Sequence, residues 1–170
     1  MVKKLGGLAA ALVTGALTLV AFTGTAAHAG TVTPMVTKLT QAQAASQLSA
    51  AGVTWSSSGN CTDRNNAHCT SFEQINQSTV SGVITLKRAS GCAINITGGT
   101  ETGHASGTYS HWNGYKVDIS HNGCIDSYIK NDFSYIGLRG DGYPQWKAPS
   151  GNLYCDEGNH WDITYYTCGC

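Results

Sequence analysis

The sequence predicts an α+β domain: a small antiparallel sheet with helices on one face and an open cleft on the other. Two observations carry this prediction. Before Gly91 the chain contains runs of helical length, one of them rich in Ala, whereas the later part contains short strands and a closing hairpin. Helices first and antiparallel strands later are typical of this class.

The first 29 residues are expected to be a secretory signal peptide rather than part of the fold. Lys3 and Lys4 form a basic start, Leu5–Phe22 is an apolar run, and Ala27-His28-Ala29 has the small-x-small pattern of a cleavage site. No second apolar run is long enough to span a membrane. We therefore expect residues 30–170 to form a single domain of a secreted, extracellular, monomeric protein.

The first elements are predicted from capping signals. Thr40-Gln41-Ala42-Gln43 is a capping box, and it opens an Ala-rich helix that ends near Gly52. Ser71 is expected to cap a second helix that runs through Phe72 to Ile75. Thr79–Ala89 fits a third helix, weakened by its internal glycine. Val83–Leu86 could instead form a strand, because its β-branched residues leave the pattern ambiguous.

The second half is predicted to be mostly strand and loop. Cys92–Thr97 and Tyr115–Ser120 are strands, and Ile125–Phe133 is a helix. Gly98–Gly107 and Gly137–Gly151 are rich in Gly, Thr or Pro and are expected to be irregular. Long connections without regular structure are uncommon unless they are functional, so both are expected to form walls of the cleft.

The chain should close with a β-hairpin. Leu153–Asp156 and Trp161–Tyr166 are short runs rich in aromatic and β-branched residues, and Gly158-Asn159 is a favourable two-residue turn between them. Glu157 and His160 then face each other at the end of the hairpin, with Cβ atoms roughly 4.5–5.5 Å apart. A metal ion on His160 would hold a water molecule within reach of the Glu157 carboxylate.

His111 and Asp118 form a second pair of candidate site residues. Apolar and polar side chains alternate along Tyr115–Ser120, so Asp118 points away from the apolar face. Gly114 lets the chain turn before that strand and brings His111 back beside Asp118. A hydrolytic zinc site needs three imidazole or carboxylate ligands, an open position for water, and a carboxylate base near that water. These two residues and the hairpin pair can supply all of the protein groups.

The spacing of these four residues resembles a known zinc signature. His111-x-x-Gly-x-x-x-Asp118 followed by Glu157-x-x-His160 is similar to the signature of the hedgehog/D-Ala-D-Ala peptidase superfamily, over residues 98–162. That group includes bacterial D,D-carboxypeptidases, D,D-dipeptidases and phage endolysin peptidases. The resemblance implies zinc bound by His111, Asp118 and His160, with Glu157 as the catalytic base.

The chain departs from the usual pattern of this superfamily in three places. Tyr109 stands where the family usually has Ser, and Lys116 stands where it favours a small residue. Residues 97–104 contain no Arg to hold a substrate carboxylate, so an endopeptidase is favoured over a carboxypeptidase. Arg64, Arg88 or Arg139 could instead reach in from elsewhere in the chain. His104 lies in that loop and is a candidate for binding the substrate or the oxyanion. Asp162 is expected either to orient His160 or to be a solvated edge carboxylate.

The sequence thus predicts a zinc-dependent peptidase, and the favoured substrate is a stem peptide of the bacterial cell wall (peptidoglycan). Two alternatives stay open: a zinc-stabilised secreted binding domain without catalysis, and a disulfide-stapled inhibitor or toxin without metal. Nucleic acid is not an expected partner, because ten basic residues balance ten acidic ones and no basic patch occurs.

The cysteines fit an oxidising compartment, since all seven follow the signal peptide. Cys61 and Cys69 flank a polar loop and are expected to form a disulfide. Two of the three residues Cys92, Cys124 and Cys155 are expected to pair. The odd number leaves at least one cysteine unpaired or bonded to another chain.

Overall fold

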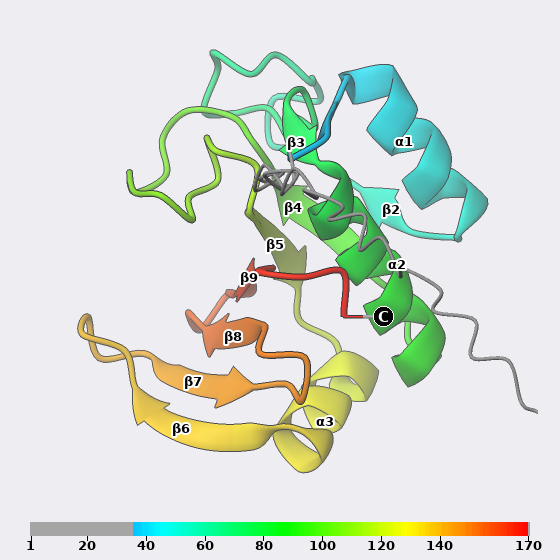
Figure 1. Ribbon diagram of the computed structural model, residues 1–170. Coiled ribbons are helices and arrows are strands. Elements are labelled where there is room, and N and C mark those ends of the chain that lie inside the picture. Colours follow the sequence, from blue (N-terminus) through cyan, green and yellow to red (C-terminus); the bar gives the residue numbers. More distant parts are fainter. Residues whose placement is uncertain (1–35, 170) are drawn as a thin grey trace, which may run out of the picture. The chain divides into compact units, whose positions relative to one another are not determined.

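The computed structural model describes residues 36–169, and the expected signal peptide lies outside them. Their elements follow one another as β1 (Lys38–Leu39), α1 (Gln41–Ala50), β2 (Thr54–Trp55), β3 (Ile75–Asn76), α2 (Gln77–Ser90), β4 (Asn95–Gly98), β5 (Lys116–Ser120), α3 (Gly123–Asp132), β6 (Ser134–Leu138), β7 (Pro144–Lys147), β8 (Leu153–Asp156) and β9 (His160–Thr164) (Figure 1). The predicted α+β class is confirmed.

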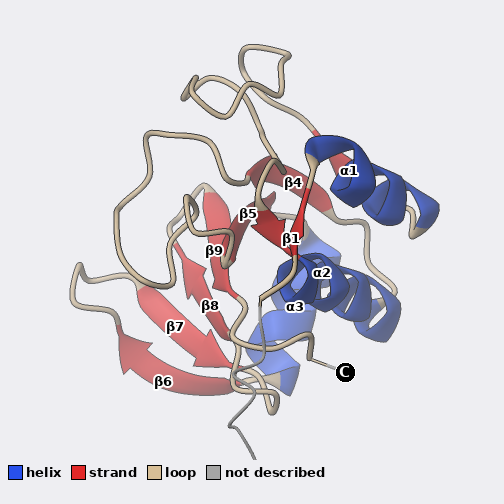
Figure 2. Ribbon diagram, turned by 45° about the horizontal axis from the view of Figure 1, so that its top comes forward, coloured by secondary structure: helices blue, strands red, loops and turns tan. Residues whose placement is uncertain are grey.

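The main sheet of the described residues is larger than predicted and is mixed rather than purely antiparallel. Its seven strands lie in the order β2-β4-β5-β9-β8-β7-β6, while β1 and β3 form a separate two-stranded sheet. Strands β2 and β4 are parallel, and the other neighbours in the main sheet are antiparallel. Figure 2 shows the helices gathered on one side of this sheet.

The extra strands β6 and β7 correct the prediction that residues 137–151 are irregular. Gly137 has a positive φ of 96°, and the register shifts between Tyr135 and Gly137. A bulge of this kind inserts a residue and interrupts the alternation by which a strand is recognised. The hairpin therefore carries no regular period in the sequence, although its strands pair over four positions.

Three of the four predicted helices are confirmed as α1, α2 and α3, and one is wrong. Thr40 caps α1 through the predicted capping box, and α2 is a continuous helix rather than a strand. The helix predicted after Ser71 is wrong, because residues 71–74 have no regular structure and Ile75 lies in β3. The backbone N–H and C=O of Ser71 bond instead to Glu101 and Thr100 of the loop after β4.

Gly82 does not weaken α2 but lets it pack closely. A Cβ atom at this position would lie 2.6 Å from Cε1 of Tyr165, whose side chain is fully buried. Real Cβ contacts are essentially never shorter than 3.0 Å. The glycine is therefore required where the helix meets the Tyr165 ring.

Alternate residues of the central strands face opposite sides of the sheet. Val117 and Ile119 of β5 lie in the same buried core as Trp161 and Ile163 of β9, together with side chains of the helices. Their neighbours in the sequence, Asp118 among them, are left to the other face. That face carries the candidate site.

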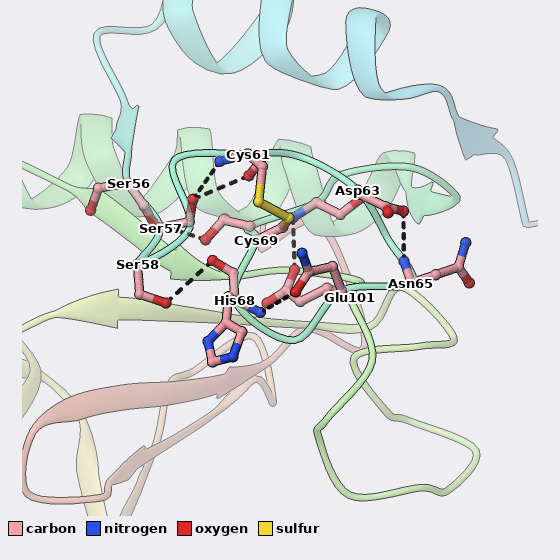
Figure 3. The surroundings of a disulfide bond; sticks show 12 residues. Ser56, Ser57, Ser58, Cys61, Asp63, Asn65, His68, Cys69 and Glu101 are labelled. Atoms are coloured by element: carbon pink, nitrogen blue, oxygen red, sulfur yellow. Dashed lines mark hydrogen bonds between the residues drawn. A yellow bond between two sulfur atoms is a disulfide. The ribbon is translucent and has the colours of Figure 1, made fainter.

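Two disulfides agree with the cysteine predictions. Cys61 bonds to Cys69, as expected, and Cys92 bonds to Cys124. Cys155 is a free, buried thiol. Figure 3 shows the first disulfide inside its polar loop, with Glu101 beside it. These bonds are consistent with an extracellular protein. Among the described residues, no helix is long and apolar enough to cross a membrane.

Candidate metal centre

The four residues predicted from the sequence come together around the carboxylate of Asp118. Nε2 of His111 lies 3.3 Å from Asp118 Oδ1, and Nε2 of His160 lies 3.6 Å from the same atom. His160 Nε2 also lies 3.3 Å from Oε2 of Glu157. As predicted, Glu157 and His160 close the hairpin, with the Glu157 N–H donating to the His160 carbonyl at 3.0 Å.

A third imidazole, that of His104, joins them from the loop after β4. Its Nδ1 lies 3.7 Å from Asp118 Oδ2, and its ring stacks on that of His111 with 3.8 Å between centroids. One ligand atom each from His104, His111 and Asp118 lies within 4.8 Å of the others, close enough to share a metal ion. The sequence placed His104 in this region as a substrate-binding residue, and its position among possible ligands was missed.

Each of the three imidazoles is held by its other nitrogen. His111 Nδ1 donates to the carbonyl of Gly99 at 2.7 Å. His104 Nε2 lies 3.0 Å from Glu101 Oε1, and His160 Nδ1 lies 2.5 Å from Asn159 Oδ1. Metal-binding histidines are usually anchored in this way, which fixes both the tautomer and the ring orientation.

Glu101 is a buried anchor for the His104 loop, with only 2% of its surface exposed. Its carboxylate accepts hydrogen bonds from the backbone N–H groups of Ser71, at 2.7 Å, and Gly99, at 2.9 Å. Burial acts to raise the pKa of Glu101, but the bonds from His104 and the backbone outweigh it and lower that pKa. The one feature of the sequence that could have indicated this role of Glu101 is that it is the single carboxylate in a loop rich in Gly and Thr.

A row of directly opposite residues crosses the sheet on the site face. Gly98 of β4 is opposite Asp118, Asp118 is opposite Asp162 of β9, and Asp162 is opposite Cys155 of β8. Such residues point to the same face. Gly98 gives Asp118 its space, because a Cβ atom there would lie 3.0 Å from Asp118 Cγ and closer still to Oδ2.

Asp118 is buried in a way that suits a ligand. It is 7% exposed, and its Oδ1 atom is buried, without a hydrogen bond of good geometry among the described residues and with Nε2 of His111 and of His160 as its neighbours. A buried carboxylate is costly to ionise unless it is paired, and imidazolium groups or a bound cation can pair it. The residues close enough to share an ion, His104, His111 and Asp118, offer two imidazoles and one carboxylate oxygen, which are donors that zinc accepts, and the predicted ligand His160 is not in this group.

The charges of His111 and Asp118 support each other. Burial acts to lower the pKa of His111, but the hydrogen bond and charge of Asp118 outweigh it and raise that pKa. Burial acts to raise the pKa of Asp118, and the nearby histidines, His111 first, lower it instead. In the absence of a metal ion the pair therefore favours a protonated imidazole beside an ionised carboxylate.

Of the three arginines that could reach in from elsewhere, Arg139, from the β6–β7 connection, is the one that completes the site. Its guanidinium donates to Glu157, to Asp162 Oδ2 at 2.9 Å and to Asp141. Asp162 was expected either to orient His160 or to be a solvated edge carboxylate, but it is buried and its ion pairs among the described residues are with two cations. It holds Arg139 and also Lys116, whose Nζ is 2.7 Å from Oδ2.

These groups line one cavity of about 520 Å³. Its walls are Gly103, His104, Ala105, His111, Lys116, Asp118, Arg139, Asp141, Glu157, His160 and Asp162. All of the predicted site residues therefore share one space. No protein-family model matches the chain, and no curated protein or solved structure matches it.

Proposed function

We propose that the chain is a secreted zinc-dependent peptidase that hydrolyses amide bonds in peptides of the bacterial cell wall. The observation that carries the proposal is the convergence of three anchored imidazoles on the buried Asp118 carboxylate, with the Glu157 carboxylate beside them in one cavity. The resemblance of the His-Asp and Glu-His spacing to the hedgehog/D-Ala-D-Ala peptidase signature supports the same assignment.

His111, Asp118 and His160 would hold the zinc ion; His111 and Asp118 belong to the group that lies close enough to share an ion, whose third member is His104, and His160 would have to approach them. Bound in such a site, zinc polarises a carbonyl group and lowers the pKa of a water molecule toward about 7. Asp118 supplies the negative charge, and Gly99 holds His111 with Nε2 free to coordinate.

Glu157 would act as the general base and then as the general acid. Its Oε2 is 3.3 Å from His160 Nε2, so it lies next to a ligand without being needed as one. In hydrolysis it would take a proton from water and deliver it to the amine that leaves. The contact with Arg139 holds the other carboxylate oxygen and fixes the direction of Oε2.

His104 favours a second candidate function, a zinc-stabilised domain that binds peptide without cleaving it. Catalytic zinc sites keep three protein ligands and an open position, whereas structural sites are closed by four. If His104 binds together with the three predicted ligands, the position needed for water is filled. If it points at the substrate instead, the site stays open.

The bond cleaved is proposed to lie inside a peptide rather than at a free carboxyl end. The cavity does contain one guanidinium, that of Arg139, but its hydrogen bonds go to Asp141, Glu157 and Asp162. Four of its five N–H donors are used in this way, so Arg139 alone offers a terminal carboxylate one donor rather than a bidentate clamp. Digestion of cell-wall material by the zinc-loaded protein, with the new termini identified by mass spectrometry, tests this choice, and release of D-Ala alone would contradict it.

Replacement of Glu157 by Gln tests the enzymatic proposal directly. Glu157→Gln should keep zinc and lose about 10²–10⁴ in rate, as removal of a general base does. Glu73→Gln is the matched control, because Glu73 bonds to the start of α1 and should keep both properties. Hydrolysis by Glu157→Gln at the parent rate would refute the role of Glu157.

Zinc content of ligand variants separates the two functions. His111→Ala, Asp118→Ala and His160→Ala should each lose zinc, while His121→Ala should retain it because His121 bonds to Asp126 and lies apart from the site. His104→Ala is the deciding variant. If it keeps zinc but loses turnover, the site is open and catalytic; if it loses zinc like the other three, the closed site is favoured.

A further inference from the structure

A second cavity, of about 220 Å³, adjoins the candidate metal centre. Three residues, Lys116, Arg139 and Asp162, line both cavities, so the two spaces meet at this trio. The second cavity is also lined by Tyr109, Gln145, Leu153, Cys155, Thr164 and Tyr166. A chain bound across the metal centre can therefore continue into it.

The row of opposite residues on the sheet forms the floor of this path. Beyond Asp162 the row continues to Cys155 of β8 and then to Gln145 of β7. At the rim, the exposed rings of Tyr109 and Tyr166 meet edge to face, with centroids 4.7 Å apart. The second cavity is thus built on strands and framed by aromatic rings.

The trio has hydrogen-bonding capacity that the described residues do not use. The Lys116 ammonium has three N–H donors and gives one of them to Asp162 Oδ2. Arg139 Nη1 has two N–H donors and also gives one to Asp162. Two cations therefore face the second cavity with spare donors; Asp162 is the one carboxylate of its lining, while Asp141 and Glu157 hold Arg139 from the side of the metal centre.

Asp162 anchors both cations on the floor of the second cavity. It is 7% exposed and its Oδ1 atom is buried, so a ligand there meets the spare donors of Lys116 and Arg139 rather than this oxygen. A carboxylate has the charge and the acceptor oxygens that such donors bind, and within a peptide it is supplied by an acidic residue.

We propose that the second cavity is a subsite for an acidic residue of the substrate peptide, whose carboxylate is bound by Lys116 and Arg139. The inference rests on the proposed peptidase function and deepens it by naming the class of substrate. Lys116 is the residue most specific to this role, since within residues 36–169 its ammonium group bonds to Asp162 alone, whereas Arg139 also holds Glu157.

Binding to the metal-free protein tests the subsite apart from catalysis. The probes are two pentapeptides, acetyl-Ala-Ala-Glu-Ala-Ala-amide and its Gln counterpart, which differ in one charge. The wild-type protein should bind the Glu peptide about tenfold more tightly, because charge-assisted hydrogen bonds are roughly twice as strong as neutral ones. Calorimetry gives both dissociation constants on the same protein, so the preference is internally controlled.

Variants of Lys116 then assign the preference to the cavity. Lys116→Met should bring the ratio of the two constants close to one, and Lys116→Arg should largely restore it. Lys147→Met is the matched control, because Lys147 is exposed on β7 and lines neither cavity. Equal binding of both peptides by the wild type, or a preference that survives in Lys116→Met, would overturn the proposal. So would binding of chitin oligosaccharides, but not of the Glu peptide, through Tyr109 and Tyr166.

The zinc-loaded protein supplies the second arm. Under the proposal, a library of internally quenched peptides should be cleaved faster when Glu replaces Gln at one fixed position beside the scissile bond. A charge preference in binding with no cleavage of any peptide would refute the peptidase and leave the subsite standing. Cleavage at the same rate whether Glu or Gln stands at any position would refute the subsite and leave the peptidase standing.

Discussion

Gly98→Ala should weaken zinc binding although Gly98 is not a ligand. The added Cβ would lie 3.0 Å from Asp118 Cγ and 3.1 Å from Asp118 Cβ, where ordinary contact begins at 3.4 Å, and nearer still to Oδ2. Asp118 is buried and its strand is paired with β9, so the backbone cannot easily yield. The clash must therefore be relieved mainly by a movement of the Asp118 carboxylate, of roughly 1 Å. Loss of support for a metal ligand typically costs about 10–100-fold in affinity, which is about 1.4–2.7 kcal/mol.

The assay is competition for zinc with a chromophoric chelator, at a pH where the histidines are neutral. Gly123→Ala is the control, because a Cβ atom there meets nothing within 4 Å and the backbone needs no positive φ. Thermal unfolding of the metal-free proteins would show whether Gly98→Ala still folds. A folded Gly98→Ala protein that binds zinc within about twofold of the wild type (about 0.4 kcal/mol) would refute the reasoning.

Three further predictions concern packing, pH and the free thiol. Gly82→Ala should lower the free energy of unfolding by about 1–3 kcal/mol, because the added Cβ would clash with the Tyr165 ring. Helix propensity alone predicts the reverse, since Ala normally stabilises a helix relative to Gly, so denaturant titration decides between a loss and a gain of stability. In the metal-free protein, the His111–Asp118 pair should contribute most stability between the ordinary pKa values of 3.8 and 6.5. That contribution is lost as pH falls through the lowered pKa of Asp118 or rises through the raised pKa of His111, and unfolding of Asp118→Asn across pH should lack this dependence. Burial raises the pKa of Cys155 to about 11, so an alkylating reagent should modify it only as fast as the protein opens; rapid labelling of the native protein would contradict its burial.

The sequence predicts those parts of the site that depend on local geometry. Glu157 and His160 are three residues apart across a turn, so their pairing follows from the hairpin alone. Asp118 faces away from the core because strand residues alternate, and Gly114 makes the turn before it with a φ of +75°. Asp118 then lies beside His111, as expected.

The parts of the site that the sequence could not assign depend on contacts between distant segments. Arg139 reaches Glu157 and Asp162 from the β6–β7 hairpin, whose alternating pattern in the sequence is interrupted by the bulge at Gly137. His104 becomes a possible ligand because Glu101 ties its loop to Ser71, thirty residues away. Neither contact leaves a periodic trace in the sequence, so neither could be inferred from spacing.

The disulfide loop has a consequence for the order in which the protein matures. Thr70, next to Cys69, donates to the carbonyl groups of Cys61 and Thr97, and Ser71 is bonded to Thr100 and Glu101. The loop closed by oxidation is thus continuous with the segment that carries Gly98, Gly99 and His104. Two events coupled in this way strengthen each other by the same factor. If the centre binds a metal ion as proposed, a chain still reduced would hold that ion more weakly, so oxidation would precede full loading of the centre, and a loaded centre would in turn protect the disulfide from reduction.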